Sequence, residues 1–479
     1  MNWQAIPFRV FRYSLRNVER AIEVGCVPTF EDAIPTQYDR FFDMAGTYGV
    51  LDGFEELTDL RTNPGVPLPA LCVLMVIRFL RKMGSFREMG QLLLRYQPLL
   101  ERLGFSVEVC EKGVYCCQRT RNRDPDEPPK AFDEEVFSEV LRALDEEELN
   151  KLLADFVKAV RKKHGALFQE GLFIMDSNGY QVVGEAVGRK WCALMARTRY
   201  GMLPAAMEFT VTKGEGSGET SIGRRVLLRA LKTYGAGFLK TVLMDAGYVD
   251  GETLRWLKKD QGIDWVLRVK DDMRASQYMA GETGEAPKWR WRQVKPPQLD
   301  CSKDQLPQRH ILWVEDVPGI AERTGKLNGC VIRDIYPASE KHPQGAVEYQ
   351  YIAGSNPEWK GAEIHDLWRK RWNIENAFGF MTDNWGLGKW QIRNPEVYRA
   401  TIQFMVLTYG LHILLQTLES KPQTLHQLKL RFEWQNHNMM LIVAGDACAI
   451  LTPKTLNDWM MRGILTLHIP LRAWPARAP

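Results

Sequence analysis

Three acidic residues in the middle of the chain stand in patterns from which carboxylates could do chemistry. Asp176 ends the apolar run Leu172–Met175, which predicts a short buried strand with the acid at its end. Asp245 ends a second apolar run, Leu239–Met244, in the same way. Working groups of α/β sheets tend to lie at strand ends, where side chains leave the packed core. Aspartate is also common in turns after strands, so the pair alone does not define a site.

A third acid, Glu375, lies in a segment whose first part lacks Pro and Gly. This segment predicts a helix from Asp366 until Gly386 ends it. At helical spacing, Trp368, Arg371 and Glu375 share one face of that helix. A carboxylate in such a basic, aromatic setting is suited to bind a metal ion beside a phosphodiester. The alternative is an ordinary surface salt bridge between Arg371 and Glu375.

The composition is typical of a soluble globular protein, with 45% hydrophobic and 25% charged residues. The 479 residues predict two to four domains. The net charge is only +4, so a nucleic-acid surface must come from clustering of the 63 basic residues.

The cysteines indicate a protein of the cytoplasm with reduced thiols. There are nine of them without a C-x-x-C pair, and no signal peptide is visible over Met1–Val10. The most apolar windows, Leu68–Leu80 and Thr401–Leu415, are too short or too polar to span a membrane.

Residues 1–165 predict a helical N-terminal region. Leu68–Leu80 is apolar throughout its length and predicts a buried helix, and Ser85–Glu88 carries an N-cap signal for the next one. Gln118–Lys130 is rich in Pro and charge and predicts an exposed connector before the helical segment Phe132–His164. DNA binding and helical packing or dimerisation are both open roles for this region.

From residue 166 the pattern changes to that of a mixed α/β domain, assigned to residues 166–274 and 351–420. Besides the two runs that end in acids, the predicted strands are Trp191–Arg197, Ala205–Thr212 and Trp265–Lys270. The predicted helices are Ile222–Tyr234, Gly251–Gln261 and Val397–Leu418. Strands that follow strands, and then a strand–helix–strand unit, indicate the α/β class. Tyr248, in the turn after Asp245, is taken as a packing residue.

Residues 275–350 break this pattern and predict a β-rich insertion, and residues 421–479 a helical C-terminal tail. The predicted strands of the insertion are His310–Val317, Gly329–Tyr336 and Val347–Ile352. The alternation over 288–292 predicts a further strand, with three basic side chains on one face: Lys288, Arg290 and Arg292. These side chains could bind the phosphates of a DNA backbone. The alternative is that they belong to an ordinary solvent-exposed surface without a partner.

Taken together, these residues resemble the acidic triad of bacterial insertion-sequence DDE transposases, in particular those with a β-rich insertion before the catalytic glutamate. The resemblance rests on FIMDSNGY around Asp176, VLMDAGYVDG around Asp245 and LWRKRWNIENAF around Glu375. It covers roughly residues 165–420. It implies a ribonuclease-H-like catalytic core of the α/β class with an inserted β-rich subdomain and a helical N-terminal region.

The glutamate helix of that family carries tyrosine, arginine, glutamate and lysine at fixed steps. The corresponding residues here are Trp368, Arg371, Glu375 and Thr382. Arginine and glutamate match, tryptophan replaces the tyrosine, and the lysine is missing. Lys389, in the following loop, is a candidate substitute.

The resemblance implies that Asp176, Asp245 and Glu375 bind two Mg²⁺ ions, for which Mn²⁺ can substitute. Two such ions activate an attacking oxygen and stabilise the leaving one. In transposition, a DNA recombination reaction, water first cuts the element ends and the freed 3′-hydroxyls then attack target DNA. Arg371 would hold a phosphate, because its planar fork matches phosphate geometry, and Trp368 would also contact DNA.

The implied partner is double-stranded DNA with terminal inverted repeats, bound by a homodimer in a synaptic complex. No membrane partner is expected, and the implied location is the cytoplasm, on the nucleoid when the protein is bound to DNA. Two alternatives to a transposase stay open: a catalytically inactive, transposase-derived DNA-binding protein, and a metal nuclease of the same fold.

Overall fold

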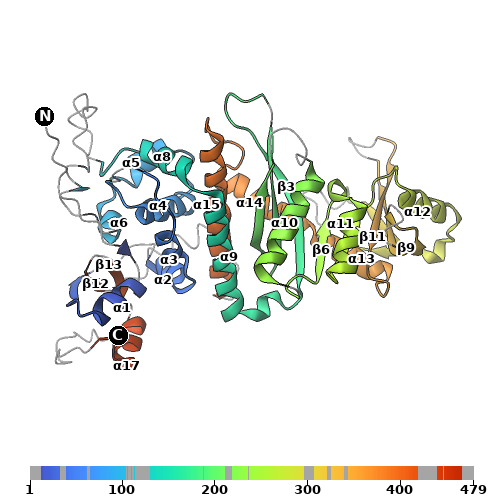
Figure 1. Cartoon of the computed structure of the whole chain (residues 1–479). Coiled ribbons are helices and arrows are strands. Elements are labelled where there is room, and N and C mark those ends of the chain that lie inside the picture. The colour runs from blue at the N-terminus through green and yellow to red at the C-terminus, as the bar shows by residue number, and fades with distance from the viewer. Residues whose placement is uncertain are drawn as a thin grey trace. The chain divides into compact units, whose positions relative to one another are not determined.

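The computed structural model describes residues 12–13, 15–32, 39–61, 65–103, 105, 109–110, 113, 130–186, 188–210, 218–235, 237–295, 307–320, 325–338, 343–418, 440–445, 447–451 and 453–465 (Figure 1). The chain divides into two compact units. Unit 1 comprises Met1–Phe156, Asn394–Leu411 and Leu418–Pro479, and unit 2 comprises Val157–Arg393 and His412–Thr417. The finer division into a core, an inserted subdomain and a tail stays a prediction.

Unit 2 is built on one large mixed sheet, which has nine strands among the described residues, in the order β5-β4-β3-β6-β7-β11-β10-β9-β8. In chain order the strands are β3 (Leu172–Tyr180), β4 (Arg189–Arg197), β5 (Met202–Phe209), β6 (Thr241–Met244), β7 (Asp264–Arg268), β8 (Arg292–Val294), β9 (Gln308–Val317), β10 (Leu327–Tyr336) and β11 (Ala346–Gly354). β3, β4 and β5 are antiparallel neighbours, whereas β6 and β7 run parallel to β3. This mixed α/β arrangement agrees with the ribonuclease-H-like core expected from the sequence.

The strands between residues 275 and 354 extend this sheet. β11 pairs antiparallel with β7, with Gly354 opposite Val266, and β10, β9 and β8 follow in antiparallel pairs. The three strands predicted for this region, His310–Val317, Gly329–Tyr336 and Val347–Ile352, are therefore confirmed. A helix that was not predicted, α12 (Arg274–Glu285), contacts β9 and β10.

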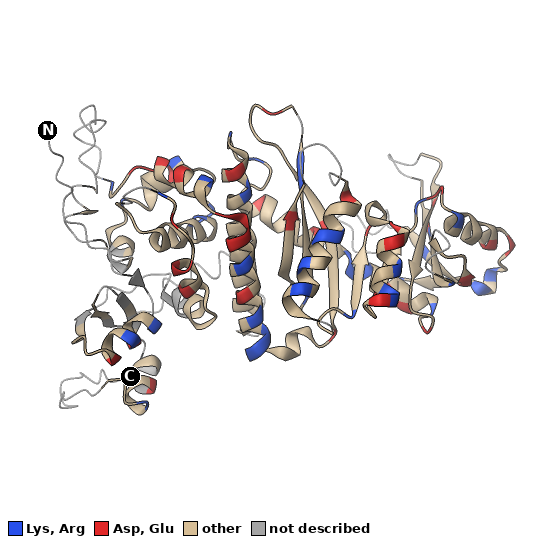
Figure 2. Ribbon diagram, viewed as in Figure 1, with Lys and Arg blue, Asp and Glu red and all other residues tan. Residues whose placement is uncertain are grey.

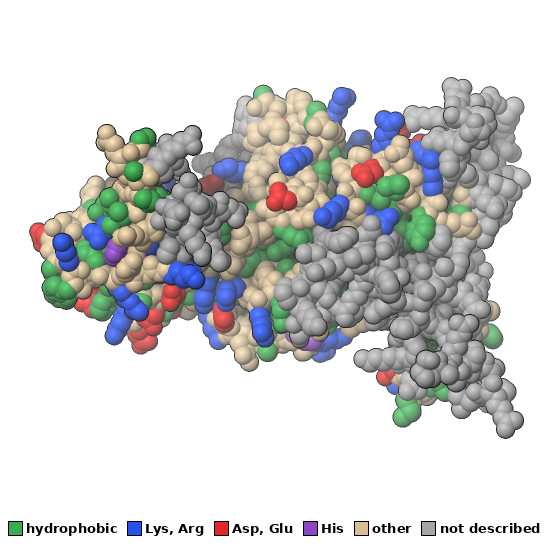
Figure 3. All heavy atoms as spheres, turned by 180° about the vertical axis from the view of Figure 1, so that it is seen from behind, with side chains coloured by type: hydrophobic (Ala, Val, Ile, Leu, Met, Phe, Trp, Pro, Cys, Tyr) green, Lys and Arg blue, Asp and Glu red, His purple; other side chains and the backbone are tan. Residues whose placement is uncertain are grey.

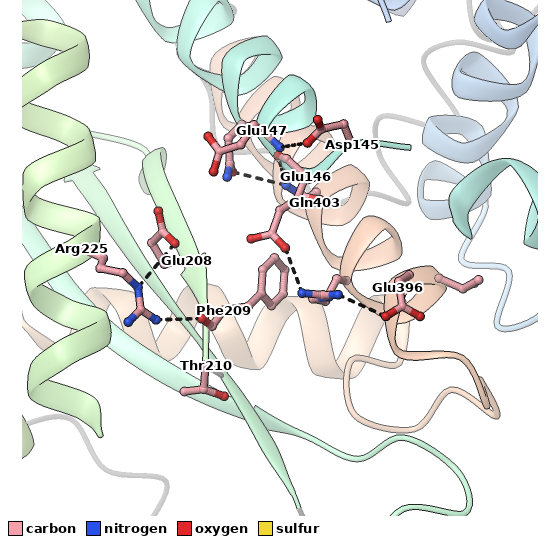
Figure 4. Close-up of polar contacts among 12 residues, drawn as sticks. Asp145, Glu146, Glu147, Glu208, Phe209, Thr210, Arg225, Glu396 and Gln403 are labelled. Atoms are coloured by element: carbon pink, nitrogen blue, oxygen red, sulfur yellow. Dashed lines mark hydrogen bonds and ion pairs between the residues drawn. The ribbon is translucent and has the colours of Figure 1, made fainter. Parts of the chain in front are cut away.

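Helices cover the core strands of unit 2. The helical elements are η2 (Gly165–Phe168), α10 (Glu219–Tyr234), η3 (Ala246–Tyr248), α11 (Gly251–Arg255) with a π-helical turn after it (Trp256–Asp260), α13 (Gly361–Lys370) and α14 (Trp372–Trp385). Figure 1 shows α10 in front of the sheet and α14 behind it, and both contact the core strands. Val226, Leu227 and Ala230 are the buried apolar stripe of α10. Arg225, on the same helix, donates to the Phe209 carbonyl oxygen of β5 at 3.0 Å (Figure 4).

The described part of unit 1 is mostly helical, as its N-terminal sequence predicts. Its helices are α1 (Leu15–Glu23), α2 (Asp39–Thr47), α3 (Val50–Glu55), α4 (Leu68–Leu80), α5 (Phe86–Leu92), α6 (Gln97–Arg102), α8 (Glu135–Ala143), most of α9 (Glu146–Lys163), most of α15 (Pro395–Leu418) and α17 (Pro453–Met461). α4 has the predicted bounds, and Ser85 caps α5 by accepting from the Glu88 amide at 3.1 Å. Apart from Lys130, the predicted connector Gln118–Lys130 lies outside the described residues.

The described part of the C-terminal tail is only partly helical: α17 is a helix, as predicted, whereas the residues before it form strands. β12 (Met440–Ala444) and β13 (Ala447–Leu451) form a hairpin. Two strands from the other end of the chain, β1 (Arg12–Tyr13) and β2 (Thr29–Asp32), flank it in the order β1-β13-β12-β2. Val18, Ile442 and Trp459 are buried in the core of this small sheet. The hairpin forms because strands distant in sequence complete its sheet.

The long helix α15 is long and apolar enough to cross a membrane, but 89% of its most apolar window is buried inside the protein. Two of its polar side chains, Arg399 and Gln403, have partners within unit 1. The Gln403 side chain donates to the Glu146 carbonyl oxygen at 3.0 Å (Figure 4), and Arg399 pairs with the Glu146 carboxylate at 3.2 Å. These contacts confirm the predicted core helix.

Candidate active site

β3 carries Asp176, but this strand does not end where the sequence predicts. The turn-forming residues after Asp176 continue the strand, because Ser177 pairs with Cys192 and Tyr180 with Arg189 of β4. Cross-strand pairing thus overrides local turn propensity. On its other side, β3 loses its parallel neighbour after Met175, where β6 ends, so Asp176 still lies at the edge of the buried core.

β6 delivers Asp245 beside Asp176. Met175 and Met244 are register partners on the two parallel strands, and each is followed directly by an acid. Asp245 caps the short helix η3 and accepts from the Ala246 amide at 2.8 Å. Asp176 accepts from the Ser177 amide, also at 2.8 Å. One oxygen of each carboxylate is held by the backbone next to it, so both side chains have a defined direction.

Glu375 and Arg371 reach the same place from the helices behind the sheet. The predicted helix begins earlier than expected, at Gly361, and is interrupted at Arg371, which lies between α13 and α14. Arg371 donates to Asp176 Oδ2 at 3.3 Å and to Glu375 Oε1. A helix prediction from local propensity cannot locate this break.

Arg371 is held firmly between these two carboxylates. Its side chain is only 11% exposed, and its guanidinium carbon lies 4.9 Å from the centre of the buried Trp368 ring. A cation over an aromatic face is stabilised by the ring quadrupole. Trp368 therefore supports Arg371 from inside the protein, and its predicted DNA contact stays a prediction.

The pKa of Asp176 is affected by the charges of the other two acids, so the three carboxylates belong to one site. Burial raises the pKa of Asp176 to about 6, and the nearby charges of Asp245 and Glu375 act in the same direction. The Ser177 amide and the Arg371 guanidinium lower the pKa but do not cancel this rise. The site thus holds negative charge for which Arg371 compensates only in part.

The donor set suits a hard divalent cation, for which carboxylate oxygens are the preferred ligands. Among the described residues, no group of three or more His, Cys, Asp or Glu side chains surrounds a metal position as it stands. Arg371 bridges two of the carboxylates instead. Arg371 therefore competes with a cation for these two carboxylates, because it contacts one oxygen of each.

The basic residues of the insertion do not form the predicted strand. Lys288–Arg290 is one turn of 3₁₀-helix after Pro287, and β8 begins only at Arg292. Trp291 packs under the guanidinium of Arg333, at 4.0 Å, which favours this conformation over the alternating one.

Two of the three basic side chains are exposed: Lys288 and Arg292. Arg290 is half-buried and contacts the Glu282 carboxylate and the Trp313 carbonyl oxygen, each at 3.3 Å. Figure 2 shows that basic residues also line α10, and Figure 3 shows basic side chains mixed with acidic ones along one edge of unit 2. The exposed pair is therefore one of several places where a DNA backbone could bind.

Tyr248 is buried, as expected of a packing residue, but the sequence does not reveal that its hydroxyl meets Ser177 beside the acids. The Ser177 and Tyr248 hydroxyls are hydrogen-bonded to each other, and Cys192 Sγ lies 3.5 Å from the Tyr248 oxygen. The one available signal in the sequence is that Ser177 and Tyr248 each follow an acid closely. Turn-forming and packing residues also occur at such positions, so this signal does not predict a contact between the two hydroxyls.

The model of the transposase DDE domain family matches residues 169–411, just over half of the chain. The chain therefore belongs to this family. Among solved structures, the chain is similar to a piggyBac transposase in a synaptic complex with hairpin DNA, with 9% sequence identity and a TM-score of 0.42. The similarity covers 92% of this chain and 89% of that one. No curated protein sequence matches the chain.

The family match and the mixed α/β core define the class of protein. The chain is a DNA transposase of the DDE type, and its activity depends on a divalent metal ion.

Proposed function

We propose that Asp176, Asp245 and Glu375 are the catalytic, metal-binding residues and that they hold two Mg²⁺ ions, for which Mn²⁺ can substitute. The observation that carries this proposal is the convergence of three charge-coupled carboxylates, from β3, the end of β6 and α14, in one partly exposed site. When bound, a pair of such ions stabilises both the attacking and the leaving oxygen of a phosphodiester displacement. The reaction is cleavage at the element ends and joining of the 3′-hydroxyls to target DNA.

Arg371 has two roles in this proposal. Without metal, it neutralises part of the charge of Asp176 and Glu375. With metal bound, its guanidinium is released to hold a phosphate of the DNA beside the acids, since the planar fork suits phosphate oxygens. Trp368 limits this movement because the guanidinium stacks on its ring.

The proposed partner is double-stranded DNA with terminal inverted repeats, synapsed by a homodimer, in the cytoplasm. Lys288 and Arg292 are exposed, so their positive charges can pair with phosphates of the DNA backbone. Arg290 forms an ion pair with Glu282, which must break before Arg290 can bind a phosphate. The proposed domains besides the catalytic core remain a helical N-terminal region, residues 1–165, and an inserted subdomain, residues 275–350.

One observation favours a second candidate, an inactive protein that still binds DNA. Thr382 lies two turns after Glu375 on α14, where the resemblance leads us to expect lysine. Lys389 is exposed in the loop after α14 and is the candidate to replace it. A protein that binds terminal-repeat DNA but never cuts it would fit this second candidate.

The test is a reaction of the purified chain with labelled terminal-repeat DNA, a target plasmid and Mg²⁺. Nicked ends together with products joined to the plasmid are expected. Nicking without joining would identify a metal nuclease of the same fold, and binding without nicking in Mg²⁺ or Mn²⁺ would identify an inactive DNA-binding protein.

The raised pKa of Asp176 predicts a pH dependence of stability in the metal-free protein. The folded-state pKa is about 6, above the ordinary value of an unfolded aspartate, so the folded protein holds this proton more tightly. This group therefore adds stability as the pH falls from 7 towards 5. The free energies of unfolding of the wild type and Asp176→Asn, measured by denaturant titration, should differ in their slopes over this range. Equal slopes would contradict the prediction.

A further inference from the structure

A side-chain hydrogen bond joins β3, which carries Asp176, to η3, the short helix that follows Asp245. Its partners are the hydroxyls of Ser177 and Tyr248. Ser177 follows Asp176 directly and also donates its amide to that carboxylate, at 2.8 Å. Tyr248 is the last residue of η3, the short helix that Asp245 caps. The bond thus links the segments around the two acids within a few residues of each.

The Tyr248 ring is locked in place by its surroundings. The residue is only 3% exposed. Gly223 of α10 passes so close that a Cβ there would lie 2.6 Å from the Tyr248 ring and 2.9 Å from the Met175 methyl group. The ring therefore occupies a tight space between α10 and β3, and a larger residue at position 223 would displace it.

The Tyr248 hydroxyl has partners on two core strands. Cys192 of β4 lies 3.5 Å away, and Cys192 is the register partner of Ser177 on β3. A phenol that is buried and fixed at its ring has little freedom to follow Ser177 if β3 shifts relative to η3. The hydroxyl pair therefore resists displacement of η3, and of the Asp245 that caps it, relative to β3.

We propose that Tyr248 is a positioning residue that fixes the spacing of Asp176 and Asp245 through Ser177, and thereby favours small divalent ions. This inference rests on the proposed function, in which both aspartates bind metal. Mg²⁺ demands near-ideal octahedral geometry, and Mn²⁺ also prefers six oxygen ligands in octahedral sites, whereas Ca²⁺ accepts variable ligand numbers and longer distances. Loss of the link between β3 and η3 should therefore weaken the binding of Mg²⁺ and Mn²⁺ more than the binding of Ca²⁺.

The test uses Tyr248→Phe in the full chain, because this change removes the hydroxyl and keeps the ring. Binding of Mn²⁺ is followed by electron paramagnetic resonance of the free ion, and Mg²⁺ and Ca²⁺ are measured by displacement. We expect the dissociation constants of Mn²⁺ and Mg²⁺ to rise about tenfold, as for other residues that orient metal ligands, with a smaller change for Ca²⁺. Ser177→Ala should reproduce this loss, and the double variant should be no worse than either single one.

Tyr234→Phe is the matched control. Tyr234 is also a buried tyrosine of unit 2, and its hydroxyl donates to the Ala205 carbonyl oxygen at 2.6 Å. The control should leave all three dissociation constants unchanged. Unchanged constants in Tyr248→Phe, equal losses for all three ions, or the same loss in the control would overturn the inference.

A third variant separates this inference from the proposed function. Asp176→Asn should abolish Mn²⁺ binding if Asp176 is a metal ligand. If it does so while Tyr248→Phe binds normally, only the positioning inference fails. If Asp176→Asn binds Mn²⁺ as the wild type does, the proposed metal site fails, and the inference fails with it.

Discussion

Glu375→Gln should lower the rate of DNA strand cleavage by about 10³-fold or more, because the catalytic acids act as one unit. Glutamine keeps the size of the side chain but removes the charge that a hard cation requires. The change also removes one of the two carboxylates that Arg371 contacts. DNA binding should stay within about threefold of wild type, since phosphate contacts made elsewhere carry most of the affinity. Single-turnover cleavage of terminal-repeat DNA and a filter-binding assay measure the two quantities.

Asp383→Asn is the control for this experiment. Asp383 is an exposed acid on the same helix, α14, and is not among the charges that act on Asp176. Its replacement should leave cleavage unchanged. Cleavage by Glu375→Gln near the wild-type rate would show that this acid is not part of the catalytic site.

Arg371→Gln should have the second largest effect, and the effect should have opposite signs in two assays. Cleavage should fall by about 10²-fold or more, as when other preorganised groups that stabilise charge are removed. Binding of Mn²⁺ to the DNA-free protein should become tighter, because the internal cation that pairs with Asp176 and Glu375 is gone. Single-turnover kinetics and metal titration measure the two effects.

Arg371→Lys tests the source of these effects. Lysine keeps the positive charge but lacks the planar fork, so cleavage should stay low while Mn²⁺ affinity remains close to that of the wild type. If Arg371→Gln cleaved DNA normally, the contact with Glu375 would be only a structural salt bridge, the alternative that the sequence left open.

Most of the core strands can be predicted from the sequence because their signals are local, although β3 continues past Asp176. The apolar runs before Asp176 and Asp245 are short and bounded, and buried strands of a mixed sheet produce such runs. The structure brings both acids together with Glu375, as their shared effect on the pKa of Asp176 shows. Parallel pairing of β3 with β6 is what places the two aspartates side by side.

Other features depend on contacts between residues that are distant in sequence. The break at Arg371 coincides with its bond to Asp176 on β3, which no local pattern reveals. The basic run at 288–292 alternates like a strand, but Pro287 and the stacking of Arg333 on Trp291 select a 3₁₀ turn. The C-terminal hairpin is completed by strands near the N-terminus. Composition and periodicity carry no information about such partners.

The most direct test of the metal site is anomalous diffraction from crystals of the protein with terminal-repeat DNA and Mn²⁺. We expect two manganese peaks, about 3.5–4 Å apart, coordinated by Asp176, Asp245 and Glu375. We also expect the Arg371 guanidinium to contact a DNA phosphate. Manganese peaks away from these carboxylates, with Arg371 still paired to Asp176 and Glu375, would contradict the proposed metal site.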